Sequence, residues 1–263
     1  MESKKRFRPR PDEAPEKQAP DGSVIVGRNP VIELLKSDRG VEKVYIQRGQ
    51  REGSVTKIFA MAKERSVPVA EVDKKRLDEL ANGNAHQGVA AFASAIEYVS
   101  IDDMIAAADR KGEKPLIVVC DGIEDPHNLG AIIRCADGAG AHGIVIGKHH
   151  SAIMSQTAFK SSAGAAEYVP IAKVANIASA IDELKEKGIW TFAAEADGDD
   201  IYGTDFNCPA AIVLGSEGIG VSRLVREKCD YSVSIPMHGN VNSLNVSTAA
   251  AVLLFEAVHN RNG

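Results

Sequence analysis

The sequence predicts an α/β protein whose larger part is built on a mostly parallel sheet. After residue 115, short apolar runs of strand length alternate with longer segments that have helical periodicity. Two loops rich in glycine and asparagine connect such apolar runs to helical segments, and a third loop has the same setting. Alternation of this kind is typical of a parallel sheet whose two faces are covered by helices.

The first 22 residues differ in composition from the rest of the chain. They contain four prolines and the basic run 4–10, and they lack a long apolar segment. We expect residues 1–22 to form a disordered tail. Either the tail is simply solvated, or it makes a loose, salt-sensitive contact with RNA.

Residues 23–98 are expected to form a small α/β domain. Asn29 as N-cap and Pro30 as the first helical residue predict a helix over about 30–37. Further helices are predicted at about 53–65 and 74–81, and strands at 41–47, 67–71 and 89–93.

Residues 99–114 are expected to form a linker with a short helix over about 101–108, which leads to a second domain, residues 115–263. Strands of this domain are predicted at 116–120, 143–147, 168–172, 189–194, 210–214 and 231–235. Helices are predicted at about 128–139, 155–163, 176–187, 221–227 and 244–259.

Composition narrows the class of protein. The chain has 263 residues, of which 44% are hydrophobic and 25% charged, and no apolar run approaches the ~20 residues that span a membrane. Its N-terminus has no apolar signal-peptide core. Four scattered cysteines without a CxxC pair, and the absence of HExxH, predict a cytoplasmic protein with reduced thiols and no metal site. The cysteines are Cys120, Cys135, Cys208 and Cys229.

The formal net charge of −5 is unevenly distributed. Residues 99–263 carry −8, whereas residues 23–98 carry +2 and the tail carries +1. We therefore expect any contact with a polyanion to concentrate in the N-terminal part or in local patches.

Three loops in the larger domain each connect a predicted strand to a predicted helix: 121–134, 214–220 and 235–247. Ligands of parallel sheets bind at the carboxyl ends of the strands, so the loops are expected to form one composite site. Their glycines allow close approach of the backbone to a ligand. A GxGxxG match at 138–143 ends a helix instead of opening one, which argues against a dinucleotide-binding enzyme.

On chemistry alone, the polar residues of these loops have two interpretations each. Asn128, Ser243 and Asn245 can cap a helix or bind a substrate. Glu217 can favour a helix N-terminus or accept a hydrogen bond from a ligand. Arg134 lies in an apolar helical run, where it either extends to solvent or holds a phosphate or an alkoxide.

Together, the loops resemble the three signature motifs of the SpoU-type RNA ribose methyltransferases of the SPOUT superfamily. Their order and their coverage of about 115–260 make the likeness specific. The segment 160–167 also resembles one common in this family. Segments 27–35 and 86–89 resemble its small substrate-binding domain, and the likeness is closest to bacterial enzymes that methylate a guanosine in large-subunit (23S) ribosomal RNA.

The resemblance implies a trefoil knot in the C-terminal domain, a homodimer and S-adenosyl-L-methionine as methyl donor. It implies cofactor binding by Gly215, Ile235 and Leu244. It implies catalytic-site roles for Arg134, Asn128, Glu217, Ser243 and Asn245. The reaction expected is methylation of a ribose 2'-hydroxyl, with large-subunit ribosomal RNA as the partner.

An alcohol is a poor nucleophile, so its proton must be removed and the developing alkoxide stabilised. A guanidinium with a pKa above ~12 is unsuited to act as a base. We therefore expect Arg134 to position and stabilise charge, while the proton passes to phosphate or water. In the small domain, Arg28, Arg48, Arg51 and His86 are candidates for RNA contacts or are ordinary surface residues.

Two other functions are alternatives to this one. A transfer-RNA ribose methyltransferase would keep the chemistry and change the substrate, although such relatives commonly carry other extensions in place of this N-terminal domain. A non-catalytic RNA-binding assembly factor would not need Asn128, Arg134, Glu217 and Asn245.

Overall fold

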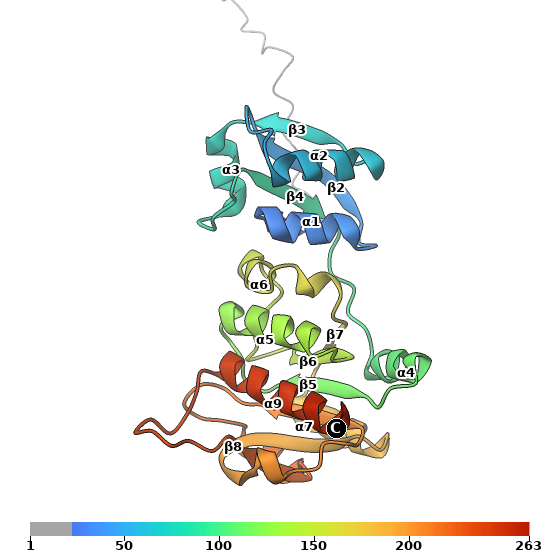
Figure 1. Cartoon of the computed structure of the whole chain (residues 1–263), viewed down its shortest axis with the longest axis vertical. Helices are drawn as coiled ribbons and strands as arrows, with labels where there is room; N and C mark the ends of the chain where they lie inside the picture. The colour runs from blue at the N-terminus through green and yellow to red at the C-terminus, as the bar shows by residue number, and fades with distance from the viewer. Residues whose placement is uncertain (1–22, 263) are drawn as a thin grey trace, which may run out of the picture.

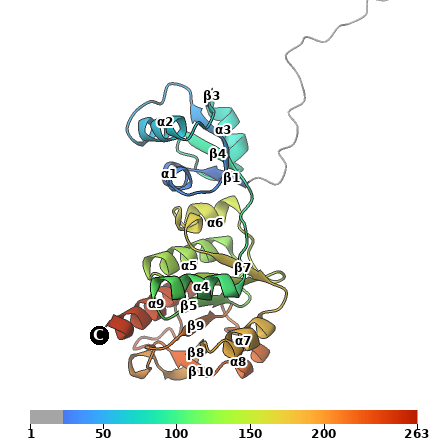
Figure 2. The same ribbon diagram turned by 90° about the vertical axis from the view of Figure 1, so that its right-hand side faces the viewer.

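The computed structural model describes residues 23–262, which form a small sheet with its helices above a larger sheet with its own (Figure 1). The prediction for the tail, residues 1–22, lies outside the described residues. α6 lies between the small domain and α5 in both views (Figures 1 and 2). The two parts therefore meet through a segment of the larger one.

The small domain has a mixed four-stranded sheet of order β1-β4-β2-β3, in which only β2 and β3 are parallel. Its strands are β1 (Ser23–Val26), β2 (Val41–Gln47), β3 (Val69–Val72) and β4 (Val89–Ala93). Its helices are α1 (Arg28–Lys36), α2 (Ser54–Glu64) and α3 (Lys74–Ala81).

The first helix begins earlier than predicted. β1, which the sequence reasoning did not identify, ends at Val26, and Gly27 makes the turn into α1 with φ of 100°. Such a conformation suits glycine, which has no Cβ to clash. Asn29 and Pro30 consequently lie inside the first turn, and the prediction that Asn29 caps the helix is wrong.

The larger sheet has six strands in the order β10-β8-β9-β5-β6-β7, and every pair is parallel. This arrangement confirms the predicted sheet. Its strands are β5 (Leu116–Cys120), β6 (Gly143–Gly147), β7 (Ile171–Val174), β8 (Trp190–Asp200), β9 (Ala210–Leu214) and β10 (Tyr231–Ser234).

Helices cover both faces of this sheet (Figure 2). Val118 belongs to one buried cluster together with residues of α5 and α9, whereas the neighbouring Val119 packs into another with residues of α4, α7 and α8. Alternate side chains of a strand point to opposite faces, so both faces are buried. The helices and short 3-10 turns are α4 (Ile101–Lys111), α5 (Pro126–Gly138), α6 (Gln156–Ser161), η1 (Ala165–Glu167), α7 (Ile177–Glu186), η2 (Ile201–Gly203), α8 (Arg223–Lys228) and α9 (Val246–Asn262).

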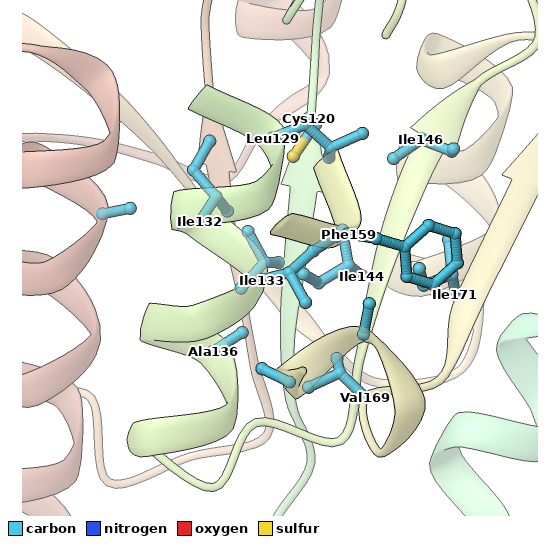
Figure 3. Close-up of a cluster of buried hydrophobic side chains, with 14 of the residues drawn as sticks. Cys120, Leu129, Ile132, Ile133, Ala136, Ile144, Ile146, Phe159, Val169 and Ile171 are labelled. Atoms are coloured by element: carbon cyan, nitrogen blue, oxygen red, sulfur yellow. The ribbon is translucent and has the colours of Figure 1, made fainter. Parts of the chain in front are cut away.

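The apolar side of α5 packs onto the sheet (Figure 3). Leu129, Ile132, Ile133 and Ala136 recur at helical spacing and are all fully buried. Phe159 of α6 belongs to the same cluster and is 1% exposed. This packing fixes α5 over the middle of the sheet and sets the direction in which its polar residues point.

Two strands of the larger sheet differ by more than one residue from their predicted bounds. Tyr168 donates its backbone N–H to the carbonyl of Ala165 and so closes η1, which delays β7 until residue 171. β8 continues to Asp200 because β10 pairs with its acidic end, where Val233 lies opposite Asp199. A charged run of this kind does not resemble a strand in sequence.

Candidate active site

The loops after β5 and β9 meet where these neighbouring strands end. The Asp121 N–H donates to the Leu214 carbonyl at 2.8 Å. The loop after β9, residues 215–222, then folds back through two backbone hydrogen bonds between Ser216 and Gly220, of 3.0 and 2.9 Å. The predicted convergence of these two loops is thereby confirmed.

Two carboxylates fix the end of the β9 loop. Glu195 Oε1 accepts from the Val221 N–H, and Asp121 Oδ2 accepts from the Ser222 N–H, both at 2.7 Å. Glu195 also lines the cavity described below. Glu195 was not predicted from the sequence. It follows the buried part of β8, and ligands bind at the carboxyl ends of strands in parallel sheets, so this position could have indicated a site residue.

Gly215 allows the β9 loop to close on itself. A Cβ at this position would lie 1.9 Å from the Gly220 carbonyl carbon and 2.0 Å from the Val221 nitrogen. Backbone atoms cannot yield to such an overlap, so any side chain here would force the loop open.

A cavity of about 650 Å³ lies between the ends of β8, β9 and β10 and the start of α9. Leu214, Ile235 and Leu244 contribute apolar wall, and Glu195 and Glu217 contribute carboxylates. A mostly apolar pocket with a few convergent polar groups is typical of cofactor sites. The three residues predicted to bind a cofactor, Gly215, Ile235 and Leu244, all line it.

Asn128, Glu217 and Asn245 form an amide–carboxylate cluster that joins all three predicted loops. Glu217 Oε1 accepts from Asn128 Nδ2 at 3.0 Å and from Asn245 Nδ2 at 2.6 Å. Asn245 Nδ2 also lies 3.0 Å from Asn128 Oδ1. Asn128 lies 89 residues and Asn245 lies 28 residues from Glu217 in the sequence, yet both amides bond the same carboxylate oxygen.

The helix-capping alternative fails for Asn128 and holds for Asn245. Asp125 caps α5 by accepting from the His127 N–H at 2.8 Å, with Pro126 as the first helical residue, so the Asn128 side chain is free to reach Glu217. Asn245 Oδ1 accepts from the Ser247 N–H at 2.9 Å and so caps α9 as well. Its side chain therefore caps α9 and also holds Glu217.

Ser243 lines the cavity wall, is exposed, and makes no side-chain hydrogen bond to the described residues. Arg134 is exposed on α5 and makes no hydrogen bond or ion pair to the residues between 23 and 262. It follows Asn128 by six positions, which places it about 120° away around the helix. The structure therefore brings together Asn128, Glu217 and Asn245 but leaves Arg134 outside the cluster of its own chain.

The candidate RNA-contacting residues of the small domain have different environments. His86 is 8% exposed; its Nδ1 accepts from the Gly88 N–H at 2.9 Å and its Nε2 lies 3.0 Å from Asp78 Oδ1. With both ring nitrogens engaged, His86 orders its own loop and is not available to grip RNA. Arg28 also bonds this loop, through the Gln87 carbonyl at 3.0 Å.

The other two small-domain candidates face solvent. Arg51 is paired with Glu71 on the surface, and Arg48 is exposed. Across the described part of the chain, no group of three or more His, Cys, Asp or Glu residues could hold a metal ion. None of the helices in residues 23–262 is long and apolar enough to cross a membrane.

Comparison with known proteins identifies both parts of the chain. Residues 115–255 match the SpoU rRNA methylase family, and residues 24–99 match the family described as RNA 2'-O ribose methyltransferase substrate binding. The Bacillus subtilis (strain 168) protein YacO, whose name places it in the TrmH family of tRNA/rRNA methyltransferases, is 44% identical over 239 residues. The alignment covers 90% of this chain and 96% of YacO.

Solved structures show the same architecture. The SpoU methyltransferase AviRb from Streptomyces viridochromogenes, in complex with AdoMet, matches with a TM-score of 0.78 and 26% identity, covering 92% of this chain and 91% of AviRb. A TrmH/SpoU tRNA modifying enzyme from A. aeolicus matches with a TM-score of 0.52 and 28% identity, covering 60% of this chain and 84% of that one. These matches confirm the predicted family: the chain belongs to the SpoU family of RNA methylases.

Proposed function

We propose that this protein transfers a methyl group from S-adenosyl-L-methionine to the 2'-hydroxyl of a guanosine in large-subunit (23S) ribosomal RNA, in the cytoplasm. The observation that carries the proposal is the amide–carboxylate cluster at the wall of the cavity. Glu217 and Asn245 both line the cavity and both belong to the cluster, so a cofactor and a substrate hydroxyl can meet there.

The methyl donor is S-adenosyl-L-methionine, and the cavity suits it. When bound, it supplies an electrophilic methyl group on a sulfonium. Ile235 and Leu244 offer apolar surface for a purine, while Gly215 keeps the backbone of the β9 loop close to the ligand. Glu195, whose side chain is only 12% exposed, lines the same cavity with its Oε2 3.9 Å from Arg226 Nη1.

Glu217 is suited to orient the ribose. Its Oε1 is occupied by two amide N–H groups, whereas Oε2 accepts no hydrogen bond from the described residues. The amides hold the carboxylate in one position and leave Oε2 to accept a ribose hydroxyl. Ser243, on the same wall, can bond a neighbouring group of the nucleotide.

Arg134 supplies the positive charge that stabilises the developing alkoxide, and a second copy of the chain delivers it. The guanidinium lies on the open face of α5, away from the cluster of its own chain. That face also carries apolar surface, because Phe255 of α9 is 51% exposed beside Gly138 of α5. An isologous homodimer through α5 and α9 would bury this surface and exchange the two arginines.

From family membership we also propose that the chain is knotted through the loops after β9 and β10. A knot would hold the cavity walls together without depending on local hydrogen bonds alone. The segment before α9 extends from the body of the domain in Figure 1 and carries Val241, which is 67% exposed. Exposed apolar residues on such a segment are consistent with contact to a second copy.

Transfer RNA is the alternative substrate. YacO carries both substrates in its name, and the A. aeolicus tRNA modifying enzyme matches only 60% of this chain. AviRb, in contrast, matches this chain over 92% of its length, including the small domain. We favour ribosomal RNA because an additional substrate domain suits a large, structured target.

The test is methyl transfer to three separate pools of undermethylated RNA. Purified protein receives labelled S-adenosyl-L-methionine with large-subunit RNA, small-subunit RNA or bulk transfer RNA. Label at a single position of large-subunit RNA is the expected result. Label in transfer RNA would retain the chemistry and overturn the target. No label in any pool despite cofactor binding would favour either a ribosomal particle as the substrate or the non-catalytic function.

A further inference from the structure

A buried ion pair connects the small domain to the catalytic domain. Arg39 Nη1, from the turn after α1, lies 2.9 Å from Oε1 of Glu167, the last residue of η1. The side chains are only 10% and 2% exposed. Ser37 Oγ donates to the other oxygen of Glu167 at 3.4 Å, so both carboxylate oxygens face the small domain.

Arg39 also contacts a helix of the catalytic domain. Its guanidinium carbon lies 4.7 Å from the ring centroid of Phe159 in α6, which is a cation–π distance. Its Nε donates to the Ser94 carbonyl, at the end of the small domain, at 2.8 Å. One side chain thus links the last strand of the small domain with both α6 and η1.

The backbone that carries Arg39 is itself held in place. Arg65 Nη2 donates to the Arg39 carbonyl at 3.0 Å, and Arg65 Nη1 donates to the Ser37 carbonyl at 2.7 Å. These bonds tie the end of α1 to the end of α2. The turn therefore presents Arg39 from a rigid base and not from a free loop.

Two further hydrogen bonds and a tight steric fit surround the pair. The Tyr168 hydroxyl donates to Glu33 Oε2 at 2.7 Å, and Gln156 Nε2 donates to the Leu80 carbonyl at 2.9 Å. Gly164 has φ of 102°, and a Cβ there would lie 2.5 Å from Glu33 Cβ. The two surfaces are therefore in close contact at Gly164.

The Arg39–Glu167 ion pair fixes how the two domains are placed more than it adds to the stability of the fold. Burial raises the pKa of Glu167, against the effect of Arg39, and burial also lowers the pKa of Arg39. The Arg39 Nη2 atom is buried without a hydrogen-bond partner. Desolvation thus offsets much of the attraction, but losing either partner would leave an uncompensated buried charge.

The α6–η1 segment, which contacts the small domain, also contacts α5 next to the active site. His127 Nδ1, one residue before Asn128, lies 3.1 Å from Ser161 Oγ at the end of α6. α5 and α6 pack closely at Gly130, where a Cβ would lie 2.4 Å from the Ala158 carbonyl. A displacement of α6 would therefore shift α5 and move Asn128 in the amide–carboxylate cluster.

We propose that Arg39 and Glu167 are positioning residues whose ion pair holds the small domain against the α6–η1 segment. The distance between the RNA-binding surface of the small domain and the active site is then fixed. This inference rests on the proposed RNA methylation. A fixed distance selects which ribose of a bound RNA reaches the cavity. Neither residue lines the cavity.

The experiment compares full-length wild type with Glu167→Gln, which keeps the size of the side chain and removes its charge. Small-angle X-ray scattering measures the separation of the domains, and steady-state methylation measures kcat and KM for RNA. We expect a larger radius of gyration and a KM for RNA raised about tenfold, with kcat and the Kd for S-adenosyl-L-methionine changed less than about twofold. Scattering and KM both equal to wild type, or an expanded protein with an unchanged KM, would overturn the proposal.

Two further variants separate positioning from folding. Arg39→Leu combined with Glu167→Leu removes both charges and should restore compaction and KM, because an apolar pair has no desolvation cost. Arg223→Ala breaks an exposed Arg–Glu pair on α8 and should match wild type in every measurement. If wild type methylates no RNA, the proposed function fails, whereas the scattering comparison still decides whether the pair locks the domains.

Discussion

Asn245 combines the predicted helix cap with a second contact, to Glu217, that the sequence does not reveal. Its carbonyl oxygen caps α9 through the Ser247 N–H, and its amide nitrogen holds Glu217 at 2.6 Å. A side-chain amide can do both because it carries a donor and an acceptor. One residue therefore belongs both to the start of α9 and to the candidate active site.

Substitution of Asn245 should separate these roles. Asn245→Ala should lower stability by about 1 kcal/mol through the lost cap and reduce kcat by roughly 100-fold through the disordered Glu217. Asn245→Ser should recover most of the stability, because serine caps helices, without recovering kcat. Thermal unfolding and single-turnover methylation measure the two effects, and a serine variant with normal kcat would contradict the proposed role.

Arg134 should not tolerate conservative replacement. A lysine retains the charge but not the planar fork that can hold an alkoxide and a phosphate together. Arg134→Lys should therefore lose roughly 100-fold or more in kcat, with the Kd for S-adenosyl-L-methionine unchanged. Near-normal turnover, measured with saturating RNA, would show that a point charge suffices.

At the scale of elements, apolar periodicity predicted most of the larger sheet. β5 and β9 occupy the predicted residues because both are short, fully buried apolar runs. The acidic end of β8 and the late start of β7 escaped prediction, since pairing with β10 and the turn at η1 are tertiary effects. β1 was missed because its four residues form a strand only by pairing with β4.

The site was predicted unevenly for a related reason. Loop residues such as Asn128 and Glu217 were identified, but the carboxylate of Glu195 was not, because its bond to the Val221 N–H depends on how the β9 loop folds back. His86 was predicted to contact RNA or to be an ordinary surface residue, since sequence does not reveal its burial and its bonds to Asp78 and Gly88.

The start of β5 should be sensitive to acid. His142 Nδ1 accepts from the Leu116 N–H at 3.0 Å, and burial is the main cause that lowers the pKa of His142. The unfolded chain therefore binds the proton more readily, so this stability is present above about pH 6.5 and is lost as the pH falls below it.

Replacement of His142 tests this dependence. An asparagine side chain at this position is uncharged at every pH, so the His142→Asn variant should lose less stability than wild type between about pH 7 and pH 5. Chemical denaturation across this range provides the measurement. Equal slopes in both proteins would assign the acid sensitivity to other groups.

At the scale of the whole molecule, the active site is predicted to be shared between two chains. Arg134 and the amide–carboxylate cluster lie on different sides of α5, so each site should take Arg134 from the partner. Neither the dimer nor the knot follows from periodicity, because both depend on how distant segments pass one another.

Mixed dimers test this sharing. Arg134→Ala and Asn245→Ala should each be inactive alone, but randomised dimers of the two should recover about a quarter of wild-type activity, since half are mixed and each of those has one intact site. If Arg134 served its own chain, every site would lack one residue and mixing would restore nothing. Wild type mixed with a variant that carries both Arg134→Ala and Asn245→Ala provides the control for subunit exchange.

We propose that the cavity and its cluster direct a methyl group to the ribose 2'-hydroxyl of a guanosine. The most direct test is digestion of RNA methylated by the wild-type protein to nucleosides, followed by mass spectrometry of the labelled product. We expect 2'-O-methylguanosine as the labelled nucleoside. Label on a base, or on the ribose of another nucleoside alone, would contradict it.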